Sequence, residues 1–296
     1  MYKEVEDILV CPRCGSKINI RKIYLKEGEE IIEGTLNCEK NHKFYIKHGI
    51  IDFHYKENKN VSNLAQFYFE RDFENINIAI ENKTPNNLRN FQNLSKQYMN
   101  AIIQKKKYKN VLDIASGRSI LLEGMAEKFS HNPNIVSLDL NFAVLKYNRK
   151  MIKKINPKAK ITYIACDYLN LPFKNSAFDC ITSYYGFPNM TQSSPRVMQE
   201  SYRILRRKGL VLDARILVSD KDEYYNQLKA IATANMNFPN PEIVSVEQLI
   251  LQIYKKIGFS EFKNEKIGES IGEFNELDII PMQGQKFKSS VLIIKK

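Results

Sequence analysis

The stretch VLDIASGRS, residues 111–119, decides the fold of this chain of 296 residues. Its apolar first half predicts a buried strand, and the segment 120–129 that follows it predicts a helix. The small side chains between them let the backbone approach a ligand closely, and the start of the helix offers N–H groups that lack helical partners. The pattern therefore predicts a ligand site at the end of a buried strand.

Further apolar strands alternate with helical patterns along the rest of the chain, which is typical of a parallel sheet covered on both faces. Ser194 is expected to cap one of the helices, with Pro195 in its first turn. The strands are predicted at 110–114, 135–140, 160–166, 178–184, 209–217, 259–268 and 286–294, and the helices at 120–129, 142–155, 194–205, 224–234 and 246–257.

The chain divides into three segments that differ in their pattern of apolar and polar residues. Residues 1–57 alternate short β-like runs with turn residues and predict a small all-β module. Residues 58–107 carry apolar side chains at helical spacing and predict a pair of helices around a break at Thr84-Pro85. Residues 108–296 hold the alternating strands and helices. We therefore expect an N-terminal module, a helical lead-in and an α/β catalytic domain.

Composition excludes several classes of protein. With 43% hydrophobic and 26% charged residues, the chain is neither disordered nor collagen-like. The net charge of +12 arises outside residues 1–57, which hold ten basic and ten acidic residues. We find no apolar run of membrane-spanning length and no signal-peptide pattern, so the expectation is a cytoplasmic protein with no membrane partner.

Two short pairs of metal-ligand residues mark the N-terminal module. Cys11 and Cys14 form a CxxC knuckle, and Cys38 and His42 form a second pair 24 residues further on. Zinc takes four such ligands in a tetrahedron, and a closed set of four protein ligands favours a structural ion. For the fourth position, His48 and His54 remain alternatives to His42. Metal binding is also a way for so small a module to gain folding free energy.

The N-terminal motifs resemble two groups of proteins. CPRCGSKI (11–18) and LNCEKNHKFYIKHGIIDF (36–53) are similar to the zinc ribbon of methyltransferases that modify a guanine base of ribosomal RNA. The ending HGIIDF is equally similar to small zinc-ribbon proteins that activate transfer-RNA methyltransferases. The first resemblance implies that Cys11, Cys14, Cys38 and His42 are the zinc ligands.

Acidic residues follow successive predicted strands. Asp139 ends the second strand, where a carboxylate can accept the hydroxyls of a ribose, and Asp167 follows the third, in position for an adenine amino group. A dinucleotide site would need Gly-x-Gly-x-x-Gly, but Ala115, Gly117 and Ile120 occupy those places. The turn therefore suits a cofactor without a pyrophosphate.

These signals together resemble class I S-adenosylmethionine-dependent methyltransferases over residues 60–296. The run ITSYYGFPNMTQSSPRVMQESYRILRRKGLVLDARIL (181–217) is similar to the ubiquinone/menaquinone C-methyltransferase family, with its Gly-x-x-Asn turn at Gly186–Asn189. The resemblance implies a Rossmann-like, seven-stranded methyltransferase sheet. It also implies that the cofactor S-adenosylmethionine is bound by Asp113, Ala115, Ser116, Gly117, Ser119, Asp139, Leu140, Asp167, Tyr168, Tyr184 and, on a lid helix, Tyr68.

The turn departs from the usual pattern at three positions. Ala115 and Ser119 replace glycines, and Arg118 occupies a place that is normally small or acidic. Both replacements are small enough to keep the turn if their φ angles are negative.

Catalytic candidates lie at the end of the fourth strand. Tyr184, Tyr185 and Asn189 carry hydroxyl or amide groups that can orient an acceptor, although the tyrosines are equally consistent with packing. Cys166 and Cys180 are expected to be core thiols.

Three functions remain open. The first is methylation of a small molecule, favoured by the Gly186–Asn189 turn and by an insert at 222–242 whose apolar side chains can roof a pocket. The second is methylation of RNA, favoured by the zinc ribbon, by Lys105–Lys107 and by seven cations within 140–160. The third is a protein that has lost its cofactor and docks a partner through the ribbon.

Overall fold

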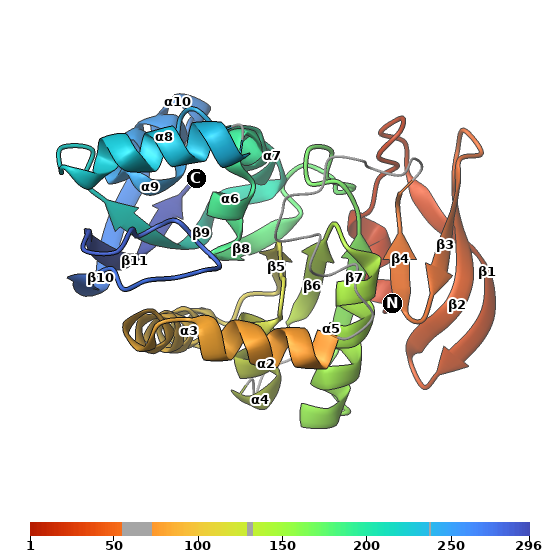
Figure 1. Ribbon diagram of the computed structural model, residues 1–296. Helices are drawn as coiled ribbons and strands as arrows, with labels where there is room; N and C mark the ends of the chain where they lie inside the picture. Colours follow the sequence, from red (N-terminus) through yellow and green to blue (C-terminus); the bar gives the residue numbers. More distant parts are fainter. Residues whose placement is uncertain (55–72, 129–132, 237) are drawn as a thin grey trace.

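The computed structural model describes residues 1–54, 73–128, 133–236 and 238–296. Its strands are β1 (Ile18–Glu27), β2 (Glu30–Cys38), β3 (Lys43–Lys47), β4 (Ile50–Asp52), β5 (Asn110–Ile114), β6 (Asn134–Asp139), β7 (Ile161–Ala165), β8 (Phe178–Tyr184), β9 (Leu205–Val218), β10 (Glu261–Ile271) and β11 (Lys286–Lys295). They form one 11-stranded sheet in the order β1-β2-β3-β4-β7-β6-β5-β8-β9-β11-β10 (Figure 1).

The helical elements are η1 (Lys3–Ile8), α2 (Phe73–Lys83), α3 (Asn86–Lys106), α4 (Ile120–Lys128), α5 (Phe142–Ile155), α6 (Gly186–Asn189), η2 (Thr191–Ser193), α7 (Ser194–Ile204), α8 (Tyr224–Met236), α9 (Glu242–Ser245) and α10 (Glu247–Ile257). Buried residues of α3, α4 and α5 pack on one face of the sheet, and those of α7 and α10 pack on the other (Figure 1). The predicted two-sided covering is confirmed.

The central strands β7, β6, β5, β8 and β9 run parallel, and β11 and β10 add an antiparallel pair at one edge. Every residue of β5 and of β7 is buried, as expected for strands with helices on both sides. β5, β8 and α5 begin and end at the predicted residues. One local expectation is wrong: α7 begins at Ser194, whose hydroxyl is buried, and the residue at its N-cap is Ser193.

The N-terminal ribbon, residues 1–54, extends the same sheet. Its strands β1 to β4 pair antiparallel in sequence order, and β4 then pairs parallel to β7. Ile50 lies opposite Tyr163 and Asp52 opposite Ala165, so the ribbon continues the sheet without a break (Figure 1). A strand of three residues is too short to be recognised by its pattern, and this junction was not predicted.

Among the described residues, no helix has both the length and the apolar composition needed to cross a membrane.

Candidate functional site

The turn after β5 adopts left-handed backbone at three alternate residues. Ala115, Gly117 and Ser119 have φ angles of 54°, 47° and 56°. The condition of negative φ, under which Ala115 and Ser119 were expected to keep the turn, is therefore not met. Left-handed backbone costs about 1 kcal/mol or more for a residue with a Cβ, because the Cβ crowds the following carbonyl. The turn keeps the shape that glycines would give it, at the cost of strain.

Gly117 is held from two sides. Its N–H donates to Asp139 Oδ2 at 3.0 Å, and its carbonyl accepts from Asn148 Nδ2 at 2.7 Å. Asn148 is fully buried on α5, and sequence reasoning missed it. The available signal was a polar residue on the apolar face that Val144, Leu145 and Ile152 define. Among the residues that the structure describes, a Cβ built on Gly117 would have only the Ala115 carbonyl oxygen within 4 Å, at 3.8 Å, so these residues leave space open beside the turn.

Asp139 stands half-buried at the carboxyl end of β6. Its Oδ1 accepts from the N–H of Asn141 at 2.9 Å, while Oδ2 holds Gly117. Burial raises the pKa of Asp139, although the backbone N–H groups oppose this effect. Each carboxylate oxygen has a second acceptor site, so the carboxylate can still accept hydroxyl donors. Leu140, the next residue, is also half-buried.

Asp167 follows β7 at the same edge, with its Oδ1 accepting from the N–H of Leu169 at 2.9 Å. Tyr168 is half-buried and packs against the core. Because parallel strands end at one edge of a sheet, the structure brings Asp139 and Asp167 to the same side as the turn after β5.

Asp113 and Ser116, two further residues predicted to bind the cofactor, make hydrogen bonds where the turn leaves β5. Asp113 is buried within β5 and accepts from Thr182 Oγ1 at 2.7 Å. Its burial raises the pKa of the carboxyl to about 6. Ser116 donates its hydroxyl to the Asp113 carbonyl at 3.1 Å and accepts from Ser137 Oγ at 2.9 Å. These contacts fix the base of the turn.

The catalytic candidates have partners within the fold. Tyr184 donates its hydroxyl to the carbonyl of Gln92 on α3 at 2.8 Å. The Tyr185 hydroxyl lies 3.0 Å from Ser95 Oγ and 2.9 Å from Ser289 Oγ, and Asn189 is exposed. Burial raises the pKa of both tyrosines, so neither hydroxyl is poised to act as a base.

Arg118, within the turn, and Tyr68, on the predicted lid helix, are the two positions that bear on how a ligand reaches the turn. Arg118 donates a guanidinium N–H to the carbonyl of Asn77 on α2 at 3.3 Å. Tyr68, the predicted lid residue, lies outside the described residues.

The ribbon gathers the predicted metal ligands. Cys11, Cys14, Cys38 and His42 place their ligand atoms within 4.8 Å of one another, a group that can hold a metal ion. Nδ1 of His42 lies 3.4 Å from Sγ of Cys11 and 3.4 Å from Sγ of Cys38, and Sγ of Cys14 lies 3.8 Å from Sγ of Cys38. His48 and His54 are not part of this group.

Much of the basic run on α5 faces the ribbon. The buried carboxylate of Glu30 pairs with Arg149 Nε at 2.9 Å and with Lys153 Nζ at 3.3 Å. Glu29 pairs with Lys160 beside them. Three of the seven cations within 140–160 therefore neutralise acidic residues of the ribbon.

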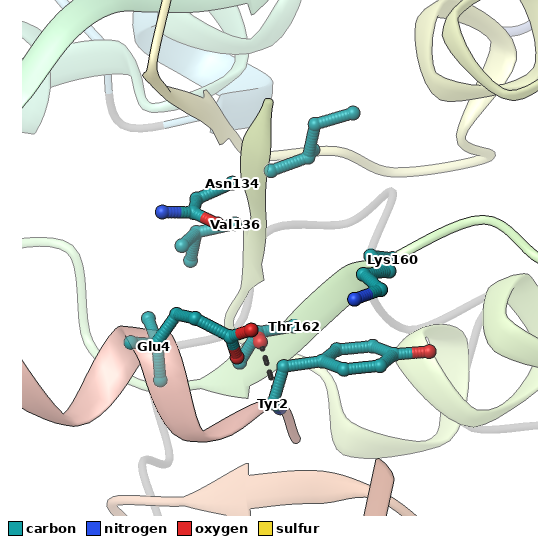
Figure 2. A pocket seen from close by; sticks show the side chains of 8 residues that line it. Tyr2, Glu4, Asn134, Val136, Lys160 and Thr162 are labelled. Carbon is teal, nitrogen blue, oxygen red and sulfur yellow. Dashed lines mark hydrogen bonds between the residues drawn. The ribbon is translucent and has the colours of Figure 1, made fainter. Parts of the chain in front are cut away.

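One small cavity lies away from this edge. It measures about 20 Å³, about enough for one water molecule, and is lined by residues of η1 and of the starts of β6 and β7 (Figure 2). The Tyr2 N–H donates to Thr162 Oγ1 at 3.2 Å within it. Because it lies at the opposite ends of the parallel strands, it is not the acceptor pocket.

The fold, the small-residue turn and the carboxylates at successive strand ends are the arrangement predicted for an S-adenosylmethionine-dependent methyltransferase. A structure from Galdieria sulphuraria, provisionally assigned as a sarcosine dimethylglycine methyltransferase, superposes with a TM-score of 0.52 at 16% identity, over 71% of this chain and 86% of that one. The MccD protein superposes with a TM-score of 0.51 at 15% identity, over 67% and 97%. These likenesses confirm the predicted α/β methyltransferase fold.

Comparison of the sequence with protein-family models shows the family to which the chain belongs. The model of the ubiE/COQ5 methyltransferase family matches residues 77–228, just over half of the chain, and the chain belongs to this family. The ubiquinone/menaquinone biosynthesis C-methyltransferase UbiE of Citrobacter koseri is 29% identical over 102 residues, which span 34% of this chain and 40% of that relative. The predicted family is confirmed, and the chain spans less than half the length of the UbiE relative that it matches.

Proposed function

We propose that this chain transfers the methyl group of S-adenosylmethionine to a small-molecule acceptor. The observation that carries the proposal is the edge formed by the ends of β5, β6 and β7. There, an open turn around Gly117 faces a carboxylate that already holds the turn in place.

The residues at this edge match the groups of the cofactor. Asp139 has acceptor sites for the two ribose hydroxyls, and Leu140 follows it along the same edge. Asp167 and Tyr168 lie on the adenine side, one strand further out. The turn of Ala115, Ser116, Gly117 and Ser119 lets the methionine part approach the backbone, with Asp113 fixing its base.

The bound cofactor supplies an activated methyl group on a sulfonium, so the protein's task is to align the acceptor and exclude water. We assign Tyr184, Tyr185 and Asn189 to the positioning of the acceptor. The hydrogen bonds of the tyrosine hydroxyls to α3 and β11 fix the rings at the end of β8. Rings that are fixed in this way are better suited to aligning the acceptor than to transferring a proton.

The choice of a small molecule over RNA rests on charge. Three basic residues that would attract phosphates are neutralised by the ribbon, namely Arg149, Lys153 and Lys160. The insert after β9 is apolar where it packs: Leu228, Ala232 and Phe238 are buried. Family relatives named for small-molecule biosynthesis agree with this choice.

We further propose that the ribbon holds one structural zinc ion. A tetrahedral zinc site with Zn–S of about 2.3 Å and Zn–N of about 2.0 Å places two sulfurs about 3.8 Å apart, and sulfur and nitrogen about 3.5 Å apart. The observed separations are 3.8 Å and 3.4 Å. The four side chains therefore fit the ion closely, with His42 binding through Nδ1.

Calorimetry with S-adenosylmethionine tests the cofactor site. We expect binding to the wild-type chain and a loss of about 100-fold in affinity in Asp139→Ala, because a charged hydrogen-bond acceptor is removed. The exposed Asp220→Ala is the control and should bind as the wild type does. If the wild type shows no binding, the proposed activity is wrong.

Transfer of a radiolabelled methyl group into a cell extract tests the acceptor. We expect the label in the fraction of small molecules and none in purified RNA. Labelling of RNA alone, with binding that weakens steeply as salt rises, would establish the alternative acceptor instead.

A further inference from the structure

The ribbon reaches the edge of the sheet where the cofactor is proposed to bind. β4 is parallel to β7, with Asp52 opposite Ala165, and the N–H of Phe53 donates to the Ala165 carbonyl at 2.9 Å. Because parallel strands end at the same edge, the residue after Phe53 emerges beside the loop that follows β7. Continuing the register by two residues places His54 level with Asp167.

His54 is held in a defined orientation. Oδ1 of Asp52 accepts from the His54 backbone N–H at 3.0 Å and lies 2.9 Å from Nδ1 of the ring. A carboxylate at Nδ1 fixes the proton there, so Nε2 is the ring nitrogen that can meet a ligand. Nε2 accepts a hydrogen bond when the ring is neutral and donates one when it is protonated. The two side chains are 25% and 32% exposed, so a ligand can reach them.

The surrounding charges agree with this placement. Three carboxylates of adjacent strands gather at this edge, namely Asp52, Asp139 and Asp167. Burial has the largest effect on the pKa of Asp139 and raises it, while a positive charge on His54 lowers it as the smallest of the contributions. Hydrogen bonds from His54 hold the pKa of Asp52 below its usual value, against the effect of burial.

We propose that His54, oriented by Asp52, binds the adenosine part of the cofactor, so that the ribbon supplies one wall of the cofactor site. This inference rests on the proposed function. It assigns a ligand-binding role to a ribbon residue that is not part of the metal cluster, and it gives a reason for the ribbon to be joined to β7 rather than tethered beside it.

Calorimetry on the zinc-loaded full chain tests the inference. His54→Ala should bind S-adenosylmethionine and S-adenosylhomocysteine about tenfold more weakly than the wild type, a loss of about 1.4 kcal/mol for each. Both ligands carry the same adenosine, so the losses should be equal. The matched control is His48→Ala, at the other end of β4, where Nε2 lies 3.5 Å from Lys146 Nζ. This control should bind both ligands as the wild type does.

Nuclear magnetic resonance gives a second readout, in which ligand binding is measured on the wild-type protein and the variants serve only to assign the signal. The chain has four histidines, so the ¹⁵N signals of the rings are few, and His54→Ala identifies the signal of His54, as Asp52→Asn does by perturbing it. Saturation with S-adenosylhomocysteine should shift the His54 Nε2 signal. If the wild type binds and neither the signal nor the affinity of His54→Ala changes, the inference is wrong while the proposed function stands. A wild type that binds neither ligand overturns both.

Discussion

The two ends of the continuous sheet are stabilised by different interactions. In the ribbon, β1 is exposed along nearly its whole length, whereas β5 and β7 of the α/β part bury every residue. The ribbon also buries apolar residues in the shared core, but it adds two specific sets of contacts, which are four metal-ligand side chains and a buried carboxylate paired with two cations. The α/β part depends on apolar burial distributed over many residues. Single substitutions at these specific contacts should therefore cost more than most substitutions elsewhere in the chain.

Removing a metal ligand should have the largest effect. Cys11→Ser is expected to lose the zinc ion and to unfold the ribbon, because structural zinc contributes about 10 kcal/mol or more to folding in small modules. Metal analysis should fall from one zinc per chain to none, and thermal unfolding should show an early transition. A chelator acting on the wild type should reproduce this result.

Cys166→Ala is the matched control for that prediction. Cys166 is equally buried but lies outside the metal cluster. We expect it to keep its zinc and to lose about 1 kcal/mol of stability through the small cavity left behind. Retention of zinc in Cys11→Ser would show that the ligand set is wrong.

A substitution at the junction between the two parts should cause the next largest loss of stability. Glu30→Gln leaves Arg149 and Lys153 without their buried partner, and since both cations keep some contact with water, we expect a loss of about 2 kcal/mol. Burial alone would raise the pKa of Glu30, but Arg149, the amino group of Met1 and Lys153 hold it below its usual value. The stabilisation is therefore present above the ordinary carboxyl range and is lost as the pH falls through the folded-state pKa.

Urea unfolding at pH 7 and in acid measures this contribution. The neighbouring Glu29→Gln removes a surface pair with Lys160 and should cause no measurable loss. Equal losses in the two variants would show that the junction does not depend on the buried pair.

The same contrast explains what the sequence could predict. β5 and β8 were placed residue for residue, since β5 is wholly buried and β8 mostly buried, which leaves a largely apolar signal in the sequence. The metal cluster was predicted because ligand chemistry restricts its spacing. The pairing of β4 with β7 was missed, because it joins a three-residue strand to one more than 100 residues away. Asn148 and the left-handed Ala115 were missed since both depend on the shape of a turn that residue types alone leave open.

Most substitutions lower the stability of a protein, but within the α/β part the replacement of one buried carboxylate should raise it at neutral pH. Burial raises the pKa of Asp113 to about 6, above its ordinary value of 3.8. Its contribution to stability is complete below pH 3.8 and is lost as the pH rises through 6. Asp113→Asn keeps an oxygen for Thr182 Oγ1 and should stabilise the protein at pH 7 by at most about 3 kcal/mol.

Unfolding of Asp113→Asn at pH 7 and pH 4 checks this sign. The gain over the wild type should shrink toward zero at pH 4, where the wild-type carboxyl is protonated in the folded state. The exposed Asp220→Asn should show no comparable dependence. A variant that is less stable than the wild type at pH 7 would mean that the charge of Asp113 is needed for the fold.

The smallest effect is expected at the strained turn. Ala115→Gly relieves a left-handed residue, which is worth about 1 kcal/mol, but it also gives the unfolded chain more freedom, so we expect a net gain of about 0.5 kcal/mol or less. Ala126→Gly in helix α4 should instead lose about 1 kcal/mol, because glycine is unfavourable within a helix. Thermal unfolding of the pair compares the same chemical change in two backbone conformations. Equal losses of stability in Ala115→Gly and Ala126→Gly would show that the left-handed backbone of the turn does not destabilise the α/β part.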